Sequence, residues 1–155
     1  MLKIRNKVIC GGLVLIAFAS CKKDKETVNN PVYNIQGNAT GAQEAPNRIA
    51  TSATATLTGT YNRDNNTLTY TITWNGLTGG NPSAMHFHGA ADPGVPAGVQ
   101  VGITGFPATA SGTVSGTATL SDTQETDLVN GQWYYNIHDA TYPAGEIRGQ
   151  VVLTQ

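Results

Sequence analysis

Histidine carries the chemistry that this sequence most clearly offers. The chain has 155 residues and three histidines, and His86 and His88 lie one residue apart in the run 84–90. On a β-strand, side chains two residues apart point to the same side, with about 6.5–7 Å between their backbone positions, so these imidazoles can converge on one metal ion. A third imidazole from a neighbouring strand would complete a three-nitrogen site suited to copper or zinc.

The third histidine, His138, ends a run with the same pattern. In residues 133–138, Trp133, Tyr135 and Ile137 occupy every second position, and His138 lies on the opposite side of the run. Met85 and Phe87 alternate with His86 and His88 in the same way. Both runs therefore predict strands with apolar side chains inside and histidine outside. If the two outward faces meet, the three histidines form one metal site. If they do not, the histidines are surface or loop-packing residues that bond to the backbone.

A second motif occupies residues 145–150, where Glu146 and Arg148 share one strand face and the glycines allow another backbone to approach closely. The two charges would form an exposed ion pair of little energetic weight. Alternatively, Arg148 would order the histidine face by bonding Asp139 or a loop carbonyl. The sequence places no nucleophile beside a base in the manner of a catalytic triad, so no catalytic residue is assigned.

Short strands must position these residues. Alternating apolar and polar residues predict a hairpin from strands at 52–60 and 67–74, joined by the turn 62–66. Further strands are predicted at 32–39, 84–90, 99–103, 112–120, 132–138 and 146–153. Residues 121–129 predict a helix capped by Asp122, with Glu125 three residues on. The predicted fold class is all-β: an immunoglobulin-like Greek-key β-sandwich or flattened barrel of seven to eight strands with one short helix.

The N-terminus predicts a lipoprotein signal peptide over residues 1–20. Three basic residues precede the apolar run 8–18, which is too short for a transmembrane helix. Residues 18–21, Phe-Ala-Ser-Cys, resemble the lipobox of bacterial lipoproteins, in which the cysteine is lipidated and becomes the mature N-terminus; here it is Cys21. The alternative is an ordinary secretory signal with a chance cysteine.

Residues 21–31 are charged and polar and end in proline, which predicts a flexible tether before a single domain at 32–155. That domain has three arginines, no lysine and eight acidic residues, a net charge of −5. This charge argues against nucleic acid or anionic membrane surfaces as partners. Because Cys10 leaves with the signal and Cys21 carries lipid, no disulfide is expected. The predicted location is the bacterial outer membrane, facing the periplasm or the cell surface.

Five segments in this order and spacing resemble the CHRD domain, named after chordin. They are GAQEAP at 41–46, LTYTI at 68–72, AMHFHG at 84–89, YYNIH at 134–138 and PAGEIRGQ at 143–150. The resemblance covers the chain from about Tyr33 to Leu153. The family has no established catalytic activity, and in animal proteins the domain accompanies modules that bind growth factors. The resemblance therefore implies a non-enzymatic binding or structural module for an unidentified protein or surface ligand.

The chain is also similar, more faintly, to copper-zinc superoxide dismutase, an immunoglobulin-like β-barrel. His86 and His88 are similar to its pair of copper ligands, residues 136–139 to the segment with its later copper ligand, and Arg148 to its arginine at the mouth of the site. The histidine that bridges to zinc, the zinc loop and the disulfide are missing, and the negative domain would repel superoxide. The similarity implies the fold and a vestigial or mononuclear metal site, not the enzyme.

Two functions thus remain open. The first is a lipid-anchored, exported module that binds a ligand or serves a structural role without catalysis. The second is a mononuclear copper or zinc protein, capable of weak redox activity, with ligands His86, His88 and His138. In that case Arg148, Glu146 and Asp139 would support the site.

Overall fold

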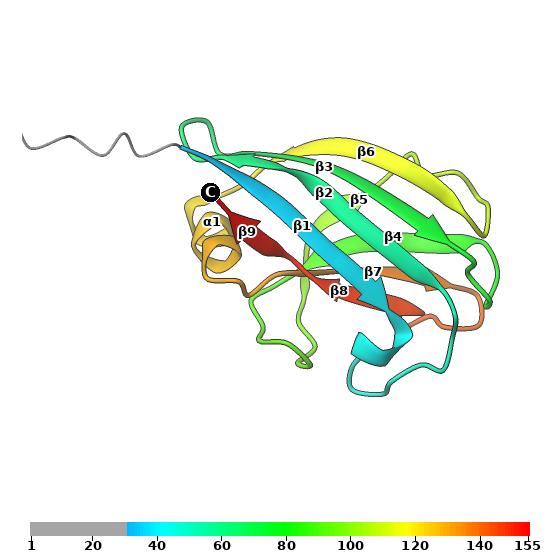
Figure 1. Ribbon diagram of the computed structural model, residues 1–155. Coiled ribbons are helices and arrows are strands. Elements are labelled where there is room, and N and C mark those ends of the chain that lie inside the picture. The colour runs from blue at the N-terminus through cyan, green and yellow to red at the C-terminus, as the bar shows by residue number, and fades with distance from the viewer. Residues whose placement is uncertain (1–30) are drawn as a thin grey trace, which may run out of the picture.

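The computed structural model describes residues 31–155 (Figure 1), which form nine strands, one α-helix and one 3-10 helix. The strands are β1 (Val32–Thr40), β2 (Thr54–Asn62), β3 (Thr67–Asn75), β4 (Pro82–His88), β5 (Val99–Ile103), β6 (Gly112–Thr119), β7 (Tyr134–Asp139), β8 (Ile147–Gln150) and β9 (Val152–Thr154). The helices are η1 (Gly41–Gln43) and α1 (Asp122–Val129). The expected signal peptide, Cys21 and the tether up to residue 30 lie outside the described residues. No helix within 31–155 has the length and apolar character needed to cross a membrane.

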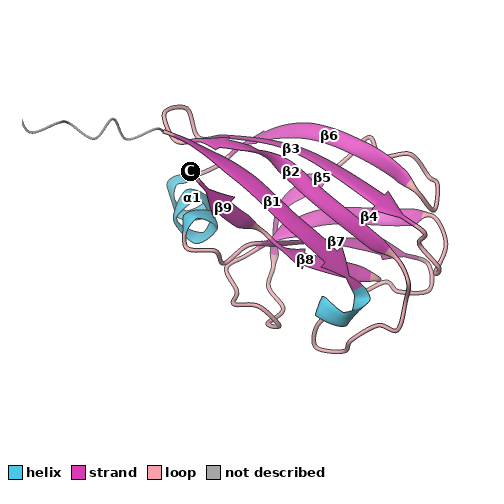
Figure 2. Ribbon diagram, in the orientation of Figure 1, coloured by secondary structure: helices cyan, strands magenta, loops and turns pink. Residues whose placement is uncertain are grey.

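All strand pairs are antiparallel, in the order β5-β4-β7-β8-β1-β2-β3-β6, with β9 also paired to β1. The strands form two facing layers (Figure 2), β5-β4-β7-β8 and β1-β2-β3-β6. The chain crosses between layers after β3, β5 and β6, in the manner of Greek-key connections. The all-β prediction is confirmed, with nine strands instead of seven or eight.

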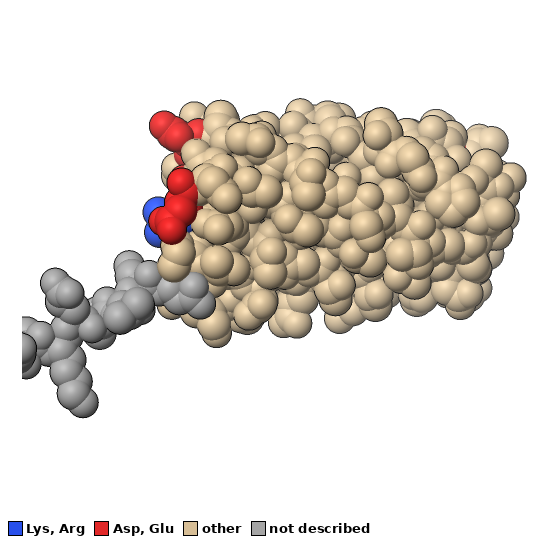
Figure 3. Space-filling model, turned by 90° about the horizontal axis from the view of Figure 1, so that it is seen from above, with Lys and Arg blue, Asp and Glu red and all other residues tan. Residues whose placement is uncertain are grey.

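The core lies between the layers because each strand turns its apolar parity inward. Its fully buried members come from both layers: Ile35, Leu57, Ile72, Trp74, Met85, Phe87, Tyr135, Ile137 and Ile147. The opposite faces of β2, β3 and β6 carry threonine and serine, with cross-strand hydroxyl contacts such as Thr73 to Thr113 at 3.0 Å. The view onto this side is almost free of charge (Figure 3), and the charged side chains visible there gather at one end.

Two glycines allow the layers to join at the seam between β1 and β8. A Cβ on Gly37 would lie 2.5 Å from the carbonyl oxygen of Gln150, and one on Gly149 would lie 2.7 Å from that of Asn38. No larger residue fits without moving a backbone. The expectation of close backbone approach at the glycines of 145–150 is therefore confirmed at Gly149.

The last predicted strand, 146–153, is divided in two. Val151 lies between β8 and β9, where its N–H donates to the carbonyl of Trp133 rather than to β1. Its side chain is buried. This break is why the strand count exceeds the expected range.

The predicted cap of α1 is wrong by one residue. Ser121 is the cap: its hydroxyl accepts from the N–H of Gln124, and the Gln124 side chain accepts from the N–H of Ser121. Ser121 has extended backbone angles, whereas Asp122 already belongs to the helix, so Asp122 and Glu125 cannot form the capping box.

The hydroxyl of Tyr135 ties the two layers together. Tyr135 is on β7 and fully buried, and its oxygen lies 3.2 Å from the carbonyl of Gly37 on β1 and 3.1 Å from that of Ala55 on β2. We expect Tyr135→Phe to lower the free energy of unfolding by about 1 kcal/mol, because the two buried carbonyls lose the one hydroxyl proton that they share. Chemical denaturation measures this. In the control Tyr33→Phe, a partly buried tyrosine loses a hydroxyl that accepts a long bond, 3.5 Å, from the exposed Arg63. An equal loss in both variants would contradict the assigned role.

Candidate metal centre

The outer face of β4 and β7 carries the predicted histidines in register. His86 on β4 lies opposite Asn136 on β7, and His88 lies opposite Tyr134. His138, two residues beyond Asn136, is diagonal to His86, within reach of a side chain across an antiparallel pair. The two histidine-bearing faces therefore meet.

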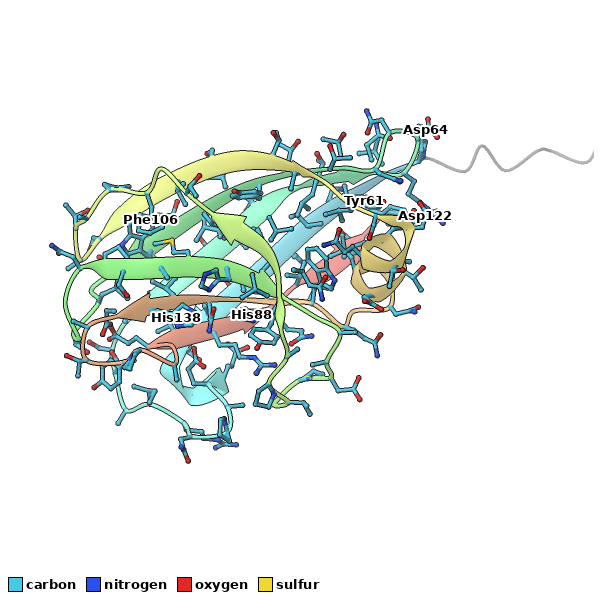
Figure 4. The ribbon with its side chains drawn as sticks, turned by 180° about the vertical axis from the view of Figure 1, so that it is seen from behind. Tyr61, Asp64, His88, Phe106, Asp122 and His138 are labelled. Atoms are coloured by element: carbon cyan, nitrogen blue, oxygen red, sulfur yellow. The ribbon has the colours of Figure 1, made fainter. Side chains whose placement is uncertain are left out.

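The three imidazoles form one cluster. One ring nitrogen of each lies within 4.8 Å of the corresponding nitrogens of the other two, and Figure 4 shows His88 and His138 side by side on β4 and β7. His86 Nδ1 is 3.1 Å from His138 Nε2, about the separation of two nitrogens bound to one ion at 2.0–2.1 Å. The ring centroid of His86 lies 5.4 Å from that of His88 and 5.0 Å from that of His138. All three predicted ligands are thus brought together.

This outer face is not open to solvent: the histidines point out from the sheet as predicted, but loops cover them. Only 8% of His88 and 9% of His138 is exposed, and His86 is half-buried. The loops before β5 and before β8 cover the face, reaching His88 through Ala97 and His138 through Pro143. Alternation predicted the direction of the side chains correctly, but it does not report what covers a sheet.

Backbone carbonyls fix the proton on two of the rings. His138 Nδ1 is 3.1 Å from the carbonyl of Pro143, and His88 Nδ1 is 3.0 Å from that of Ala97. A carbonyl only accepts, so each Nδ1 carries a proton and donates it. Each Nε2 is then left with its lone pair, the arrangement in which imidazoles bind metals while their other nitrogen bonds a carbonyl.

His88 Nε2 faces an unfavourable partner. It lies 3.0 Å from Asn136 Oδ1, so two acceptors meet unless His88 takes a second proton, which its burial disfavours. In the observed orientation, Asn136 Nδ2 lies 3.4 Å from the carbonyl oxygen of Ala144. Turning the amide by 180° would relieve the contact with His88 but would place Oδ1 of Asn136 against that carbonyl oxygen. Either orientation leaves two acceptors in contact. A cation bound at His88 Nε2 would remove the mismatch.

Burial favours the neutral form of all three histidines. Desolvation lowers the pKa of each, that of His138 to about 4. The charge of a neighbouring imidazole further lowers the pKa of His86 and His138, and the charge of Arg148 does so for His88. Neutral imidazoles coordinate a metal without first losing a proton.

Arg148 holds a loop over this face. Its Nη2 donates to the carbonyl of Val95 at 2.9 Å, and its guanidinium carbon lies 3.4 Å from the centre of the Tyr134 ring. That ring stacks on His88 at 4.7 Å between centroids, and its hydroxyl accepts from the N–H of Ala97. The expected bond from Arg148 to a loop carbonyl is confirmed. The prediction of an exposed ion pair between Glu146 and Arg148 is wrong, because Arg148 is only 2% exposed and forms no ion pair with Glu146.

Glu146 and Asp139 are also buried, which corrects the exposure expected for Glu146. Glu146 accepts from the hydroxyls of Thr51 and Thr78 and from two backbone N–H groups of the loop before β4. Burial, and then the bond to Glu146, raise the pKa of Asp139. Burial opposes ionisation of Glu146, but bonds from Asp139 and both threonines bring its pKa down to about 2. Glu146 therefore anchors the loop that leads into β4, and Asp139 accepts from the N–H groups of Thr141 and Tyr142 in the loop after β7.

Three residues of the site went unrecognised in the sequence: Tyr134, Asn136 and Glu44. The first two share the parity of His138, so the alternation that selected His138 could have found them. Glu44 lies in the segment 41–46, one of the five family-like segments. Only 6% of it is exposed, and no described residue pairs with its Oε1.

Burial raises the pKa of Glu44 to about 7, opposed by the N–H of Ala45 and the charge of Arg148. Between the ordinary carboxyl value of 4.5 and about 7, the folded state keeps a proton that the unfolded chain has lost. Stability therefore falls as pH rises through this window. We expect Glu44→Gln to gain stability relative to the unsubstituted protein, on the order of 1–3 kcal/mol, as pH rises from 4.5 to 7.

Denaturant titrations across that pH range provide the measurement. Asp64→Asn, at an exposed turn, is the matched control and should follow the unsubstituted protein. A stability difference for Glu44→Gln that does not change with pH would show that the carboxyl group is not held in its neutral form.

Comparison with known proteins identifies the family. The model of the CHRD domain matches residues 35–151, which is most of the chain and includes all three histidines and Arg148. The chain therefore belongs to the CHRD domain family. Searches of the curated proteins and of the solved structures returned no match.

Proposed function

We propose that this member of the CHRD domain family is a non-enzymatic module that binds one copper or zinc ion through His86, His88 and His138. The observation that carries the proposal is the convergence of three imidazole nitrogens within 4.8 Å on one covered sheet face. Two of the rings have their other nitrogen fixed on a backbone carbonyl.

The donor set suits these metals. Three imidazoles without a carboxylate or thiolate favour copper or zinc over magnesium or calcium, which prefer oxygen ligands. Carbonyl partners that orient ligand imidazoles are the usual support for such sites. The bond between His86 and His138 takes the place of the ion when none is bound. His88 would exchange its contact with Asn136 for the metal, which removes the contact between two acceptors described above.

The cluster is accessible from one side. His86 is the half-buried member and lines an open hollow of about 350 Å³ on β4 and β5, together with Ser83 and Phe106. An ion can reach His86 there without displacing the loop held by Arg148. Three protein ligands leave a further coordination position for water or a small ligand.

Metal stoichiometry tests the proposal. We expect chain purified without a histidine tag to take up about one Cu²⁺ or Zn²⁺ after metal removal and reloading, measured by elemental analysis. His86→Ala and His138→Phe should each weaken binding at least tenfold, because each removes one of three ligands. Phenylalanine fills the buried position of His138 without offering a nitrogen.

Ser83→Ala, at an exposed position of β4, is the matched control and should bind as the unsubstituted protein does. Unfolding curves establish that each variant is folded before its affinity is compared. Well under one metal per chain in the unsubstituted protein, or equal affinity in both histidine variants and the control, would rule the site out.

We also propose that Cys21 is lipidated and anchors the domain to the bacterial outer membrane. The lipobox-like residues 18–21 and the polar stretch that follows support this. Lipid on the N-terminus holds a protein at a membrane without a spanning segment. Cys21→Ser should abolish fatty-acid labelling and move the protein out of the membrane fraction. Cys10→Ser should leave both unchanged, and membrane-bound, labelled Cys21→Ser protein would contradict the assignment.

A further inference from the structure

A cleft beside the histidine face gathers two of the three cations of the described domain. It has a volume of about 390 Å³ and lies between the segment 42–46, the turn at Pro93 and Gly94, and β8. Arg48 lies exposed at its rim, and Arg148 forms part of its wall. In a domain of net charge −5 without lysine, this convergence of two guanidinium groups is a local exception.

The charge of Arg148 has no anionic partner in the described part of the chain. The ion pair found there joins Arg63 and Glu125, so no carboxylate lies within 4.0 Å of Arg148. A buried guanidinium is costly without an anion or a full set of acceptors. One of its five N–H donors reaches the Val95 carbonyl.

The surroundings of the Arg148 guanidinium favour a planar anion as its ligand. The Tyr134 ring covers the face of the guanidinium, with its centre 3.4 Å from the guanidinium carbon. With that side taken by the ring, the N–H donors along the edge of the guanidinium remain for a further ligand. A planar carboxylate fits such an edge with two parallel hydrogen bonds.

Glu44 limits the charge of the ligand. It is buried, lines the same cleft, and has an Oε1 without a partner in the described chain. A fully ionised Glu44, together with the negative domain, would disfavour a dianion. The raised pKa of this carboxyl group allows it to donate a hydrogen bond to a bound carboxylate instead. A ligand with one negative charge satisfies both Arg148 and Glu44.

Two glutamines supply acceptors for the rest of the ligand. Gln43 and Gln150 line the cleft and donate their side-chain N–H groups to the carbonyls of Asn38 and Gly131. Their amide oxygens are left to accept hydrogen bonds, which suits hydroxyl groups. The cleft volume is within the range that holds one sugar-sized molecule.

We propose that this cleft binds a small hydroxylated monocarboxylate of the uronic acid class, with its carboxylate on the edge of Arg148 and Arg48 at the rim. No histidine lines the cleft, so binding of the carboxylate can be tested separately from metal binding. It gives the module a ligand class in addition to the metal.

Calorimetric titration with galacturonate, in the presence of a chelator, tests the proposal on the full domain without metal. Galactose is the matched neutral probe. We expect saturable binding of galacturonate at millimolar concentration, competition by acetate, and at least tenfold weaker binding of galactose. Arg48→Gln should weaken galacturonate binding at least tenfold. Because Arg48 is exposed, this substitution leaves the fold intact even if replacing Arg148 does not.

Arg63→Gln is the control, because Arg63 pairs with Glu125 away from the cleft, and it should bind galacturonate unchanged. The proposal is overturned if galacturonate does not bind, whether or not acetate does, or if galactose binds as tightly as galacturonate. It is also overturned if Arg48→Gln matches the unsubstituted protein, or if inorganic phosphate binds more tightly than galacturonate, which would indicate a general anion site.

Discussion

The register of β7 between β4 and β8 is the constraint on which the rest of this structure depends. It sets His86 against Asn136 and Asn136 against Arg148 across three strands. A slip of one residue in β7 would turn His138 toward the core and Tyr135 outward. The buried pair Phe87 and Tyr135, which face each other on the inner side of the same strands, opposes that slip. The apolar core thus determines where the imidazoles meet.

The Tyr134 ring links the two functional regions of the outer face. Because β7 lies between β4 and β8, the ring is held between the His88 imidazole and the Arg148 guanidinium. The same three side chains all bond the segment 95–97. The loop before β5 therefore covers His88 and closes one wall of the arginine cleft, while the loop before β8 covers His138. These loops explain why His88, His138 and Arg148 are buried although they lie outside the sandwich core.

Sequence alone predicted the strands and the parity of their side chains. Strict alternation in β2 and β3, and the shared side of His86 and His88, follow from local geometry that does not depend on the rest of the fold. The pairing of β4 with β7 joins residues about fifty positions apart, and no local pattern specifies it. The resemblance of 84–89 and 134–138 to one family indicated that both segments mattered, but not that they are neighbours.

The burial of polar residues could not be predicted for a different reason. Alternation assigns Glu146 and Arg148 to the outer face but does not show that loops fold over that face. The hydroxyls of Thr51 and Thr78, which satisfy Glu146, come from distant loops, and only the tertiary structure brings them together. The error at the helix cap was smaller: Ser121 and Asp122 are both good caps by residue type, and the preceding strand decides which one has extended backbone angles.

The account rests on His86, His88 and His138 acting as one coordination site with defined ring protons. Two-dimensional ¹⁵N–¹H spectroscopy of the histidine rings, before and after one equivalent of Zn²⁺, measures this directly. Before metal, His88 and His138 should each carry their proton on Nδ1. With metal, all three rings should shift together, with Nε2 of His88 and His138 as the bound nitrogens and both Nδ1 protons retained. A proton on Nε2 of His138 in the free protein, or a shift confined to one ring, would contradict the account.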